Sequence, residues 1–578
     1  MTPVSHGKPC AGNPHARFDE GASASEKPRR NALLHKIKTM CMLAVVGVAA
    51  MPLNAASRTI QMLPGESWWG CANYFGKEMP FTARTRLTID LTKDGYANQY
   101  ASFLVSDKGR AIWCDELARF EIGEGAIAVT PMLDVPVELV ETGGTLRDAF
   151  RHASKTWFPP SGKMPDPLFF SAPQYNTWCE LIHFHSEKGI LDYAKAMLDN
   201  GLPPGVLMID NSWQAAFGTW RFEASRFSDP KGMVRKLHAM GFKVILWMVP
   251  FVTMDTMEYR LFERGLAVDD SAEPQPVGGL LGTPGKKGAP AAVKWWCGKS
   301  ALLDLTHPRA REWFKGVCDG LMRDYEVDGF KFDGGHLIFY NKGYETYRPA
   351  TPGEQVMEYA KFNLLYPLCE YRNAWKFQGQ PVVERLHDKH HTWEALRKLI
   401  PDLAAGGLIG HPFLCPDMIA GGSAKEFLKG APLDQELFVR SAQLHALCGM
   451  MQFSASPWRC LDAEKQQIIR DTVALRQKFA ARFVELAAAC GRTGEPMLRN
   501  LEYMFPGRGY AGIKDEFMMG DFLLVAPVLE KGAASRRVVI PPGKWLADDG
   551  QTVLGPAEID VAAPLSRLPH FVSMEVAQ

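Results

Sequence analysis

The stretch DGFKFDGGH, residues 328–336, is a short apolar run that ends with an aspartate on a Gly-Gly turn. Because side chains alternate along a strand, Lys331 and Asp333 share one face, and Phe330 and Phe332 share the other. This pattern fits a strand with a polar face inside a barrel and an apolar face toward outer helices. A cation and an anion then meet at the strand's carboxyl end, where β/α barrels place their chemistry. Asp-Gly-Gly alone is also an ordinary turn, so this interpretation requires a second carboxylate and a substrate.

The sequence around this stretch alternates strand-like runs with helix-like runs from about residue 166 onward. The strand-like runs are VLMID at 206–210, KVILWMV at 243–249, VDGFKF at 327–332 and PVVER at 381–385. The helix-like runs include residues 189–201 and 229–241, and each ends at a glycine, the residue preferred after a helix. Alternating strands and helices indicate parallel β/α units. We therefore predict an α/β fold in which residues 166–489 form a (β/α)8 barrel.

The segments on either side of the predicted barrel have β-strand patterns. Residues 58–165 contain short alternating runs broken by turns, which predict an N-terminal β-sandwich. After about residue 490 the helical period stops, and the runs FLLVAPVL and RRVVIPPGKW predict a C-terminal β domain over residues 490–578.

The largest insertion in the predicted barrel, residues 266–300, is rich in Gly and Pro and contains Trp295 and Trp296 near its end. Long loops on the catalytic face of a barrel often form lids or substrate subsites. We expect one of the two indoles to reach the pocket. The alternative is that both indoles anchor the loop on the barrel and contact no ligand.

The first 57 residues are predicted to be a leader rather than part of the fold. Residues 1–35 are polar and rich in Gly, Ser, Pro and charge, a composition typical of disorder. Lys36 and Lys38 then precede an apolar run over residues 40–53, followed by Asn-Ala-Ala at 54–56. This pattern is typical of a signal peptide that is cleaved near Ala55 or Ala56. We therefore expect a periplasmic or secreted protein without stable membrane insertion, with an uncleaved N-terminal anchor as the alternative.

The charge balance and the cysteine spacing exclude several classes of partner. The chain has 65 Lys+Arg and 64 Asp+Glu, so it lacks the basic surplus that indicates binding to nucleic acid or anionic lipid. The twelve cysteines show no CxxC spacing, which argues against a zinc site. Export would permit disulfides, and the first pair to test is Cys71 with Cys114. Cysteines in helix-like segments, such as Cys318 and Cys448, are expected to be buried thiols.

Eight motifs along the chain occur together in one order. They are IDNSWQ at 209–214, FSDPKGMVRKLHAMGFKVILWMVPFV at 227–252, DGFKFDGG at 328–335, ERLHDKHHTWEAL at 384–396, GLIGHPFLCPDMIAGG at 407–422, FSASPW at 453–458, GEPMLRNLEYMFP at 494–506 and IKDEFMMGDFLLVAPVLEKG at 513–532. This ordered set resembles glycoside hydrolase family 31. The resemblance implies a retaining α-glycosidase that needs no cofactor and no metal.

Retention of configuration requires two carboxyl groups on opposite sides of the scissile bond. Asp333 matches the family's nucleophile, which follows the fourth barrel strand. Asp388 matches the acid/base, because family members carry an aspartate five residues before a tryptophan, here Trp393, after an arginine-bearing strand. His387 stands where the family usually has glycine. The surrounding HDKHH sequence, residues 387–391, could instead be a solvated charge cluster or a metal site.

Further residues are candidates for substrate binding. Asp210 resembles the aspartate that grips sugar hydroxyls in the family, with a helix-capping or turn residue as the alternative. Lys331 would keep Asp333 ionised and bind hydroxyls, although a buried lysine could also form a Schiff base. The remaining candidates are Arg385 and Asp417, which match pocket positions, and Trp178, Trp247 and Trp296, which would form apolar walls unless they are core residues.

These observations predict an exported, exo-acting retaining α-glycosidase that hydrolyses terminal α-linked hexosides of an oligosaccharide or glycoconjugate. The stretch KWWCGKSALLDLTHP at 294–308 resembles a bacterial branch of the family related to myogenesis-regulating glycosidase, some of whose members act on α-galactosides. An α-galactoside is therefore favoured over an α-glucoside, although Cys297 departs from the asparagine expected there. The alternatives are a transglycosylase on the same scaffold and a non-catalytic carbohydrate-binding barrel. The presence of both carboxylates argues against the latter.

Overall fold

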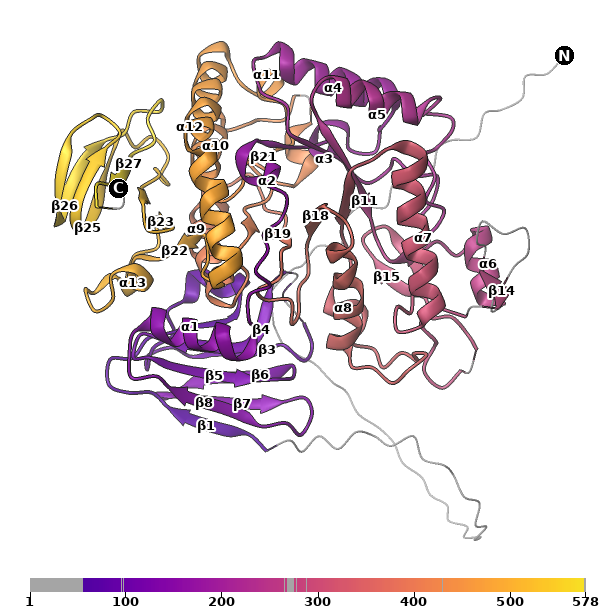
Figure 1. The fold of residues 1–578 in the computed structure, drawn as a ribbon, viewed down its shortest axis with the longest axis horizontal. Helices are drawn as coiled ribbons and strands as arrows, with labels where there is room; N and C mark the ends of the chain where they lie inside the picture. The colour runs from indigo at the N-terminus through magenta and orange to yellow at the C-terminus, as the bar shows by residue number, and fades with distance from the viewer. Residues whose placement is uncertain are drawn as a thin grey trace, which may run out of the picture.

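The computed structural model describes residues 56–94, 96, 98–264, 266–267, 275–276, 278–286, 288–428 and 430–575. The described chain forms two antiparallel sheets near the N-terminus, a parallel barrel, and one antiparallel sheet at the C-terminal end (Figure 1). The predicted signal peptide up to Ala55 lies outside the described residues, and of the two predicted cleavage positions, Ala55 and Ala56, only Ala56 is described. Among the helices of the described ranges, none is both long and apolar enough to cross a lipid bilayer.

The central element is an eight-stranded parallel barrel. Its strands in chain order are β9 (Gln174–Asn176), β10 (Val206–Ile209), β11 (Lys243–Met248), β17 (Gly329–Phe332), β18 (Leu368–Tyr371), β19 (Val383–Arg385), β20 (Leu414–Cys415) and β21 (Gln452–Phe453). β21 pairs with β9, and a parallel bridge between Met418 and Gln452 joins the segment after β20 to β21. The ring is therefore closed, and the predicted (β/α)8 barrel is confirmed.

Helices surround this barrel and connect its strands. They are α4 (Glu187–Asp199), α5 (Pro230–Ala239), α7 (Pro308–Tyr325), α8 (Pro352–Ala360), α9 (Trp393–Leu408), α10 (Gln435–Ala446) and α12 (Ala463–Thr493), with the short helices α2 (Leu168–Ser171), α3 (Trp178–Leu181), α6 (Met257–Glu263) and α11 (Pro457–Cys460). The Ser186 side chain caps α4 and the Asp229 side chain caps α5. Gly201 and Gly241 follow these helices with φ of +79° and +92°, which lie in the region that glycine adopts most easily.

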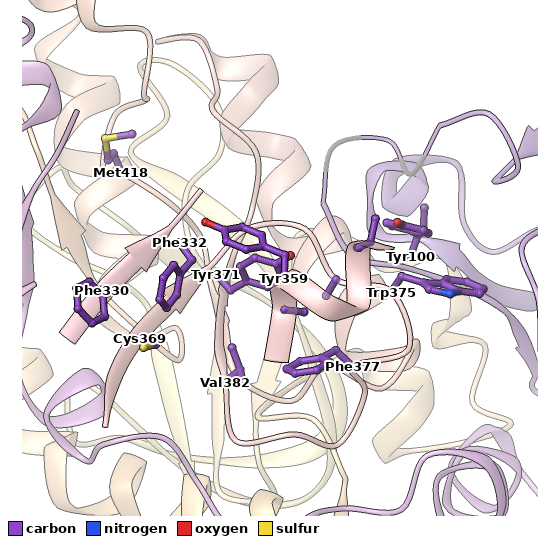
Figure 2. Close-up of a cluster of buried hydrophobic side chains, with 14 of the residues drawn as sticks. Tyr100, Phe330, Phe332, Tyr359, Cys369, Tyr371, Trp375, Phe377, Val382 and Met418 are labelled. Carbon is purple, nitrogen blue, oxygen red and sulfur yellow. The ribbon is translucent and has the colours of Figure 1, made fainter. Parts of the chain in front are cut away.

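The two faces of β17 have the environments that the alternation of DGFKFDGGH predicts. Phe330 and Phe332 belong to a buried apolar cluster that also contains Cys369 and Tyr371 of β18 (Figure 2). The ring of Phe332 lies 6.3 Å from that of Phe314 on α7, so this face contacts the helix layer. Lys331 points to the interior, where its ammonium meets Asp210 and Glu370. Asp333 is thereby directed toward the open end of the barrel.

The N-terminal part is a sandwich of two four-stranded antiparallel sheets. One sheet has the order β1 (Arg58–Gln61), β7 (Ala126–Pro131), β6 (Ala118–Gly123), β3 (Leu87–Asp90), and the other has the order β2 (Trp68–Ala72), β4 (Tyr100–Ser106), β5 (Arg110–Cys114), β8 (Val137–Glu141). Helix α1 (Leu146–Trp157) follows, and its first turn is stabilised by a capping box between Thr145 and Asp148.

The suggested disulfide between Cys71 and Cys114 is wrong, because both are free, buried thiols. Cys71 lies on β2 and Cys114 on β5, and β4 runs between these strands. Two strand spacings separate the backbones by roughly 10 Å, which exceeds the span of a disulfide. Cys318 and Cys448 are buried thiols, as expected.

Strands β15 (Val293–Trp295) and β16 (Gly298–Leu302) at the end of the insertion form a small sheet with β12 (Phe251–Val252), which precedes the insertion. The two-stranded pair β13 (Leu266–Ala267) and β14 (Gln275–Pro276) lies beside α6. After α12, Gly494 adopts a φ of +75° and ends the helical segment. The C-terminal sheet then has the order β22 (Leu498–Arg499), β23 (Phe517–Met519), β24 (Leu523–Val525), β27 (His570–Ser573), β25 (Ser535–Ala547), β26 (Thr552–Ala562), with α13 (Leu501–Met504) between β22 and β23. The predicted β structure on both sides of the barrel is therefore confirmed.

Candidate active site

A cavity of about 390 Å³ opens at the carboxyl ends of the barrel strands. Eight of the nine residues predicted to form the site line it. They are Trp178, Asp210, Trp247, Trp296, Lys331, Asp333, Arg385 and Asp388. The lining also contains Asn211, Arg372, Lys389, His390, Met418, Gly422 and Ser423, which the sequence analysis did not single out. The volume falls within the range typical of small-molecule sites.

Asp333 leaves the fourth strand, β17, and its carboxylate is held on both oxygens. Oδ1 accepts a hydrogen bond from the backbone N–H of Gly334 at 2.8 Å, and Oδ2 accepts one from the indole N–H of Trp247 at 3.0 Å. The side chain is almost fully buried. Gly334 and Gly335 have φ of +72° and +66°, so the Gly-Gly turn allows the chain to fold sharply beneath the carboxylate. These contacts leave Asp333 ionised and fixed in direction.

Asp388 follows the sixth strand, β19. Two arginine side chains, Arg372 and Arg385, lie between Asp388 and Asp333. Arg372 donates through Nη1 to Asp333 Oδ1 at 3.3 Å and through Nη2 to Asp388 Oδ2 at 3.0 Å. Arg385 donates through Nη2 to Asp333 Oδ2 at 3.5 Å and through Nη1 to Asp388 Oδ1 at 3.2 Å. Each guanidinium group therefore binds both carboxylates. The two carboxylates lie on either side of the two guanidinium groups.

The arginines also determine the charge of the two carboxyl groups. Burial opposes ionisation of Asp333, but the charges of Arg372, Arg385 and Lys331 outweigh it and hold the pKa of Asp333 well below its usual range. The carboxylate of Asp388 is 43% exposed toward the cavity. Partial desolvation raises its pKa, while Arg372 and then Arg385 lower it, and the net result is also a pKa well below the usual range. Both groups are anions in the ligand-free protein.

Lys331 and Asp210 form a buried ion pair at the base of the cavity. The ammonium of Lys331 lies 2.9 Å from Asp210 Oδ2, and the side chain of Lys331 is only 3% exposed. Burial lowers the pKa of Lys331, but the negative charge of Asp210 reverses this effect, so the net shift is upward. A lysine that stays protonated is a poor nucleophile, which argues against the Schiff-base interpretation. Asp210 caps no helix, since its Oδ1 accepts only from the N–H of Asn211.

The four tryptophans near the cavity have different roles. Trp247 is buried and donates to Asp333, so it is a hydrogen-bond donor as well as a wall. Trp178 lines the cavity and is held by its indole N–H, which donates to the carbonyl of Gly422 at 2.9 Å. Trp296 lines the cavity and is 49% exposed, whereas Trp295 is 6% exposed. The insertion therefore places one indole in the pocket and uses the other as an anchor.

Asp417 lies behind the cavity and not in its lining, which corrects the expectation that it lines the pocket. Its side chain is fully buried, with Oδ1 3.3 Å from Arg385 Nη1 and Oδ2 3.6 Å from Lys389 Nζ. The residue has a φ of +67°, an uncommon backbone conformation for aspartate that turns the chain after β20. In this position Asp417 supports Arg385 and Lys389 from beneath.

The histidines of the HDKHH sequence point in different directions. His387 is half-buried with its ring 5.9 Å from that of Tyr74, and desolvation of the ring lowers its pKa to about 4. His390 meets Glu426 at 2.8 Å, and His391 bonds to the carbonyl of Ala420 at 2.9 Å. Within the described ranges, no group of three or more His, Cys, Asp or Glu is placed to hold a metal ion. These histidines have separate protein partners.

Arg372 is the functional residue that the sequence analysis missed most clearly. It follows β18, whose sequence LCEY contains the charged Glu370 and lacks the long apolar run of β11. Glu370 is fully buried, lies 3.9 Å from Lys331, and accepts from the amide of Gln452 at 2.7 Å. In the sequence, Arg372 is marked only by its position directly after the four-residue strand β18. That position indicates a site residue only if β18 is first identified as the fifth barrel strand.

Comparisons with known proteins agree with this fold. Residues 170–385 match the glycosyl hydrolases family 31 TIM-barrel domain, and residues 494–575 match the glycosyl hydrolase family 31 C-terminal domain. The mouse protein myogenesis-regulating glycosidase is 33% identical over 421 residues, which cover 71% of this chain and 57% of that protein. The isomaltosyltransferase of Sporosarcina globispora is 26% identical over 387 residues, covering 62% of this chain and 34% of the relative. The chain thus spans well under two thirds of the length of these relatives.

Among solved structures, a family 31 α-xylosidase from a soil metagenome superposes with a TM-score of 0.73 at 19% identity, covering 90% of this chain and 79% of that structure. This likeness shows the shared fold. The match to the TIM-barrel domain includes Asp333 and Arg372 and ends at Arg385, three residues before Asp388. Asp388 itself lies outside this match.

Proposed function

The chain belongs to glycoside hydrolase family 31, and we propose that it is a retaining α-glycosidase that uses Asp333 as nucleophile and Asp388 as acid/base. The observation that carries this proposal is the pair of facing carboxylates, bridged by Arg372 and Arg385 at the carboxyl end of the barrel. Two carboxyl groups on either side of one small cavity are what a double displacement at an anomeric carbon requires.

Asp388 is protonated in the substrate complex. In the first step, ionised Asp333 attacks the anomeric carbon, the bond to the leaving oxygen breaks, and this oxygen takes the proton of Asp388. In the second step, Asp388 removes a proton from water as the water attacks the anomeric carbon of the glycosyl-enzyme, and the bond to Asp333 breaks, which releases the sugar and the Asp333 carboxylate. Trp247 and the Gly334 N–H hold Asp333 in line for attack. The Lys331–Asp210 pair offers charged groups to the sugar hydroxyls, and Trp178 and Trp296 provide apolar surfaces for the sugar ring.

We further propose a preference for α-galactosides. The support is the stretch at 294–308, which contacts the cavity and resembles a branch of the family some of whose members act on α-galactosides. It contributes Trp296 to the lining, and Cys297 Sγ lies 3.6 Å from the side-chain nitrogen of Asn211, the residue after Asp210. Residues of this stretch can therefore affect which hydroxyl configuration is accepted.

The test is a screen of nitrophenyl α-glycosides, including the galactoside, glucoside, xyloside and N-acetylgalactosaminide, with the β-anomers as controls. The first-formed sugar, observed by NMR before mutarotation, is expected to have the α configuration. An initial β product would contradict retention, and hydrolysis of the glucoside in preference to the galactoside would contradict the sugar preference. Glycosylated acceptors in place of free sugar would favour the transglycosylase alternative, the activity named for the Sporosarcina globispora relative.

We also propose export, on the basis of the leader pattern at residues 36–56. In a Gram-negative host, the mature protein is expected in the periplasmic or extracellular fraction, with an N-terminus near Ser57 by mass spectrometry. Recovery of the full-length chain from the cytoplasm would contradict this proposal.

A further inference from the structure

Two side chains of the N-terminal sandwich bind the backbone of the arginines that bridge the catalytic carboxylates. The side-chain nitrogen of Gln99 donates to the carbonyl oxygen of Arg372 at 3.0 Å and to that of Arg385 at 3.1 Å. The side-chain nitrogen of Asn98 donates to the same Arg385 carbonyl at 2.7 Å. Both Asn98 and Gln99 are fully buried. The sandwich and the active site are thus connected through backbone groups of the barrel.

The hydrogen bonds of Gln99 fix the orientation of its amide. Its Oε1 accepts from the side-chain nitrogen of Asn73 at 2.9 Å, while its two N–H groups are used by the two arginine carbonyls. Rotating the amide by 180° would place Oε1 against two carbonyl oxygens. A carboxylate or an apolar side chain at this position could not make the two donor contacts. The site therefore requires a primary amide of the length of glutamine.

The strand register explains why one amide can reach both arginines. In the ladder between β18 and β19, Glu370 pairs with Val383 and Tyr371 pairs with Glu384. Arg372 and Arg385 are the next residues in this register, where the ladder stops. Gln99 holds the two carbonyls together at the end of the ladder. Its amide nitrogen therefore constrains how far apart the two arginine backbones lie.

The backbone beside Gln99 is itself attached to the chain after β18. Gln99 forms a parallel bridge with Ala374, and the N–H of Tyr100 donates to the Ala374 carbonyl at 3.4 Å. The ring of Tyr100 stacks on that of Trp375 with centroids 5.6 Å apart and an interplanar angle of 19°. Figure 2 shows these two rings side by side at the boundary between sandwich and barrel. Gln99 is consequently a rigid support and not a side chain on a mobile loop.

We propose that Gln99 is a positioning residue of the active site, which fixes the spacing of Arg372 and Arg385 and, through their guanidinium groups, the separation of Asp333 and Asp388. The N-terminal sandwich then serves catalysis although Gln99 is absent from the cavity lining. This inference rests on the proposed function. A displacement of catalytic groups by about 1 Å can cost on the order of 100-fold in rate. Loss of the Gln99 contacts should therefore affect turnover more than substrate binding.

The test compares Gln99→Met, which keeps the length and removes both donors, with wild type and with Arg151→Gln. Arg151 lies in α1 of the sandwich and pairs with Glu495, so its variant disturbs a contact between the sandwich and the rest of the chain without touching either arginine. We expect Gln99→Met to lower kcat by about 10- to 100-fold with little change in KM. The acidic limb of its pH profile should also move upward, because the two guanidinium groups hold the carboxylates less closely. Arg151→Gln should keep the wild-type kcat and pH profile.

A folded Gln99→Met protein with wild-type kcat and pH profile would overturn the inference while leaving the proposed function intact. If Gln99→Met does not fold, Gln99→Asn keeps the amide but shortens the side chain by one methylene, and unaltered kinetics in that variant would also overturn it. If the wild type hydrolyses no α-glycoside, the proposed function fails separately. A crystal structure of Gln99→Met, or of Gln99→Asn if the former does not fold, then decides the inference: displaced guanidinium groups support it, and unchanged ones refute it.

Discussion

Arg372 binds Asp388 through Nη2, 3.0 Å from the carboxylate Oδ2. This ion pair keeps Asp388 ionised, whereas a general acid must hold a proton when the leaving group departs. A bound sugar must therefore weaken the contact between Arg372 and Asp388. In the ligand-free protein the ion pair thus favours the ionised form of Asp388, and the role proposed for Asp388 requires that bound substrate raise its pKa.

Substitution of each carboxylate should produce a different defect. Asp333→Asn should abolish formation of the glycosyl-enzyme, because no nucleophile remains. Asp388→Ala should retain it with nitrophenyl glycosides, whose leaving groups need little protonation, and should lose about 10²- to 10⁴-fold with alkyl glycosides. Azide should restore turnover only in Asp388→Ala, as measured by release of nitrophenol and detection of the glycosyl azide. Equal losses on both substrate types without azide rescue would contradict the assignment of Asp388.

Removal of the Arg372 charge should move the pH profile upward. Arg372 is the largest charge that lowers the pKa values of Asp333 and Asp388, so both pKa values rise in Arg372→Met. In the substrate complex, the ionised nucleophile is then lost at a higher pH and the protonated acid persists to a higher pH. Both limbs of the kcat profile therefore move to higher pH. Arg372→Lys is the matched control, because lysine keeps the positive charge but cannot bind both carboxylates through two separate nitrogens. This variant should have a lower rate but a smaller shift of the pH profile than Arg372→Met. An unmoved profile in Arg372→Met would refute this account.

Substitution of Trp295 should lower stability, whereas substitution of Trp296 should weaken substrate binding. Trp295 stacks on Phe251 with centroids 4.2 Å apart and donates to Ser300 at 3.0 Å. Trp295→Ala should cost about 3 to 5 kcal/mol in the free energy of unfolding. Trp296 is half exposed in the cavity, so Trp296→Ala should raise KM by about 10-fold at an unchanged Tm. Wild-type kinetics in a folded Trp296→Ala protein would remove Trp296 from the substrate site.

Glu495 should make stability depend on pH in the acid range. Burial raises its pKa, but hydrogen bonds from Arg147 and Arg151 lower it from 4.5 to about 2. A folded-state pKa below the unfolded value stabilises the protein above the unfolded pKa, and this stabilisation is lost as pH falls toward the folded pKa. Because solvent screens the partly exposed Arg151, Glu495→Gln should cost about 1 to 2 kcal/mol at pH 7, less than the full shift in pKa would give.

Urea denaturation of wild type and Glu495→Gln between pH 7 and pH 2 measures this difference. The gap between the two unfolding free energies should be constant above about pH 5 and should close as the pH approaches 2. A gap that stays the same at all pH values would show that packing, and not the charge of Glu495, is responsible.

The local pattern of the sequence was sufficient for the barrel and for most of the site. Alternation placed Lys331 and Asp333 inside and Phe330 and Phe332 outside, because side-chain direction along a strand depends only on adjacent residues. Strands β10 and β11, the alternating strand β17 and the glycine-ended helices α4 and α5 were recognisable for the same reason. The two carboxylates followed from spacing and family resemblance.

Tertiary structure alone decided the features that depend on residues far apart in the chain. Strands β9, β20 and β21 have only two or three residues, too few for a period, and are stabilised by neighbours on the barrel. The order of β2, β4 and β5 separates Cys71 from Cys114, and no local pattern encodes that order. Gln99 and Arg372 are 273 residues apart, and their contact exists only because the sandwich docks where β18 ends. A hydrogen bond between side chain and backbone at that separation leaves no periodic signal, because its geometry is set by the packing of domains and not by neighbouring residues.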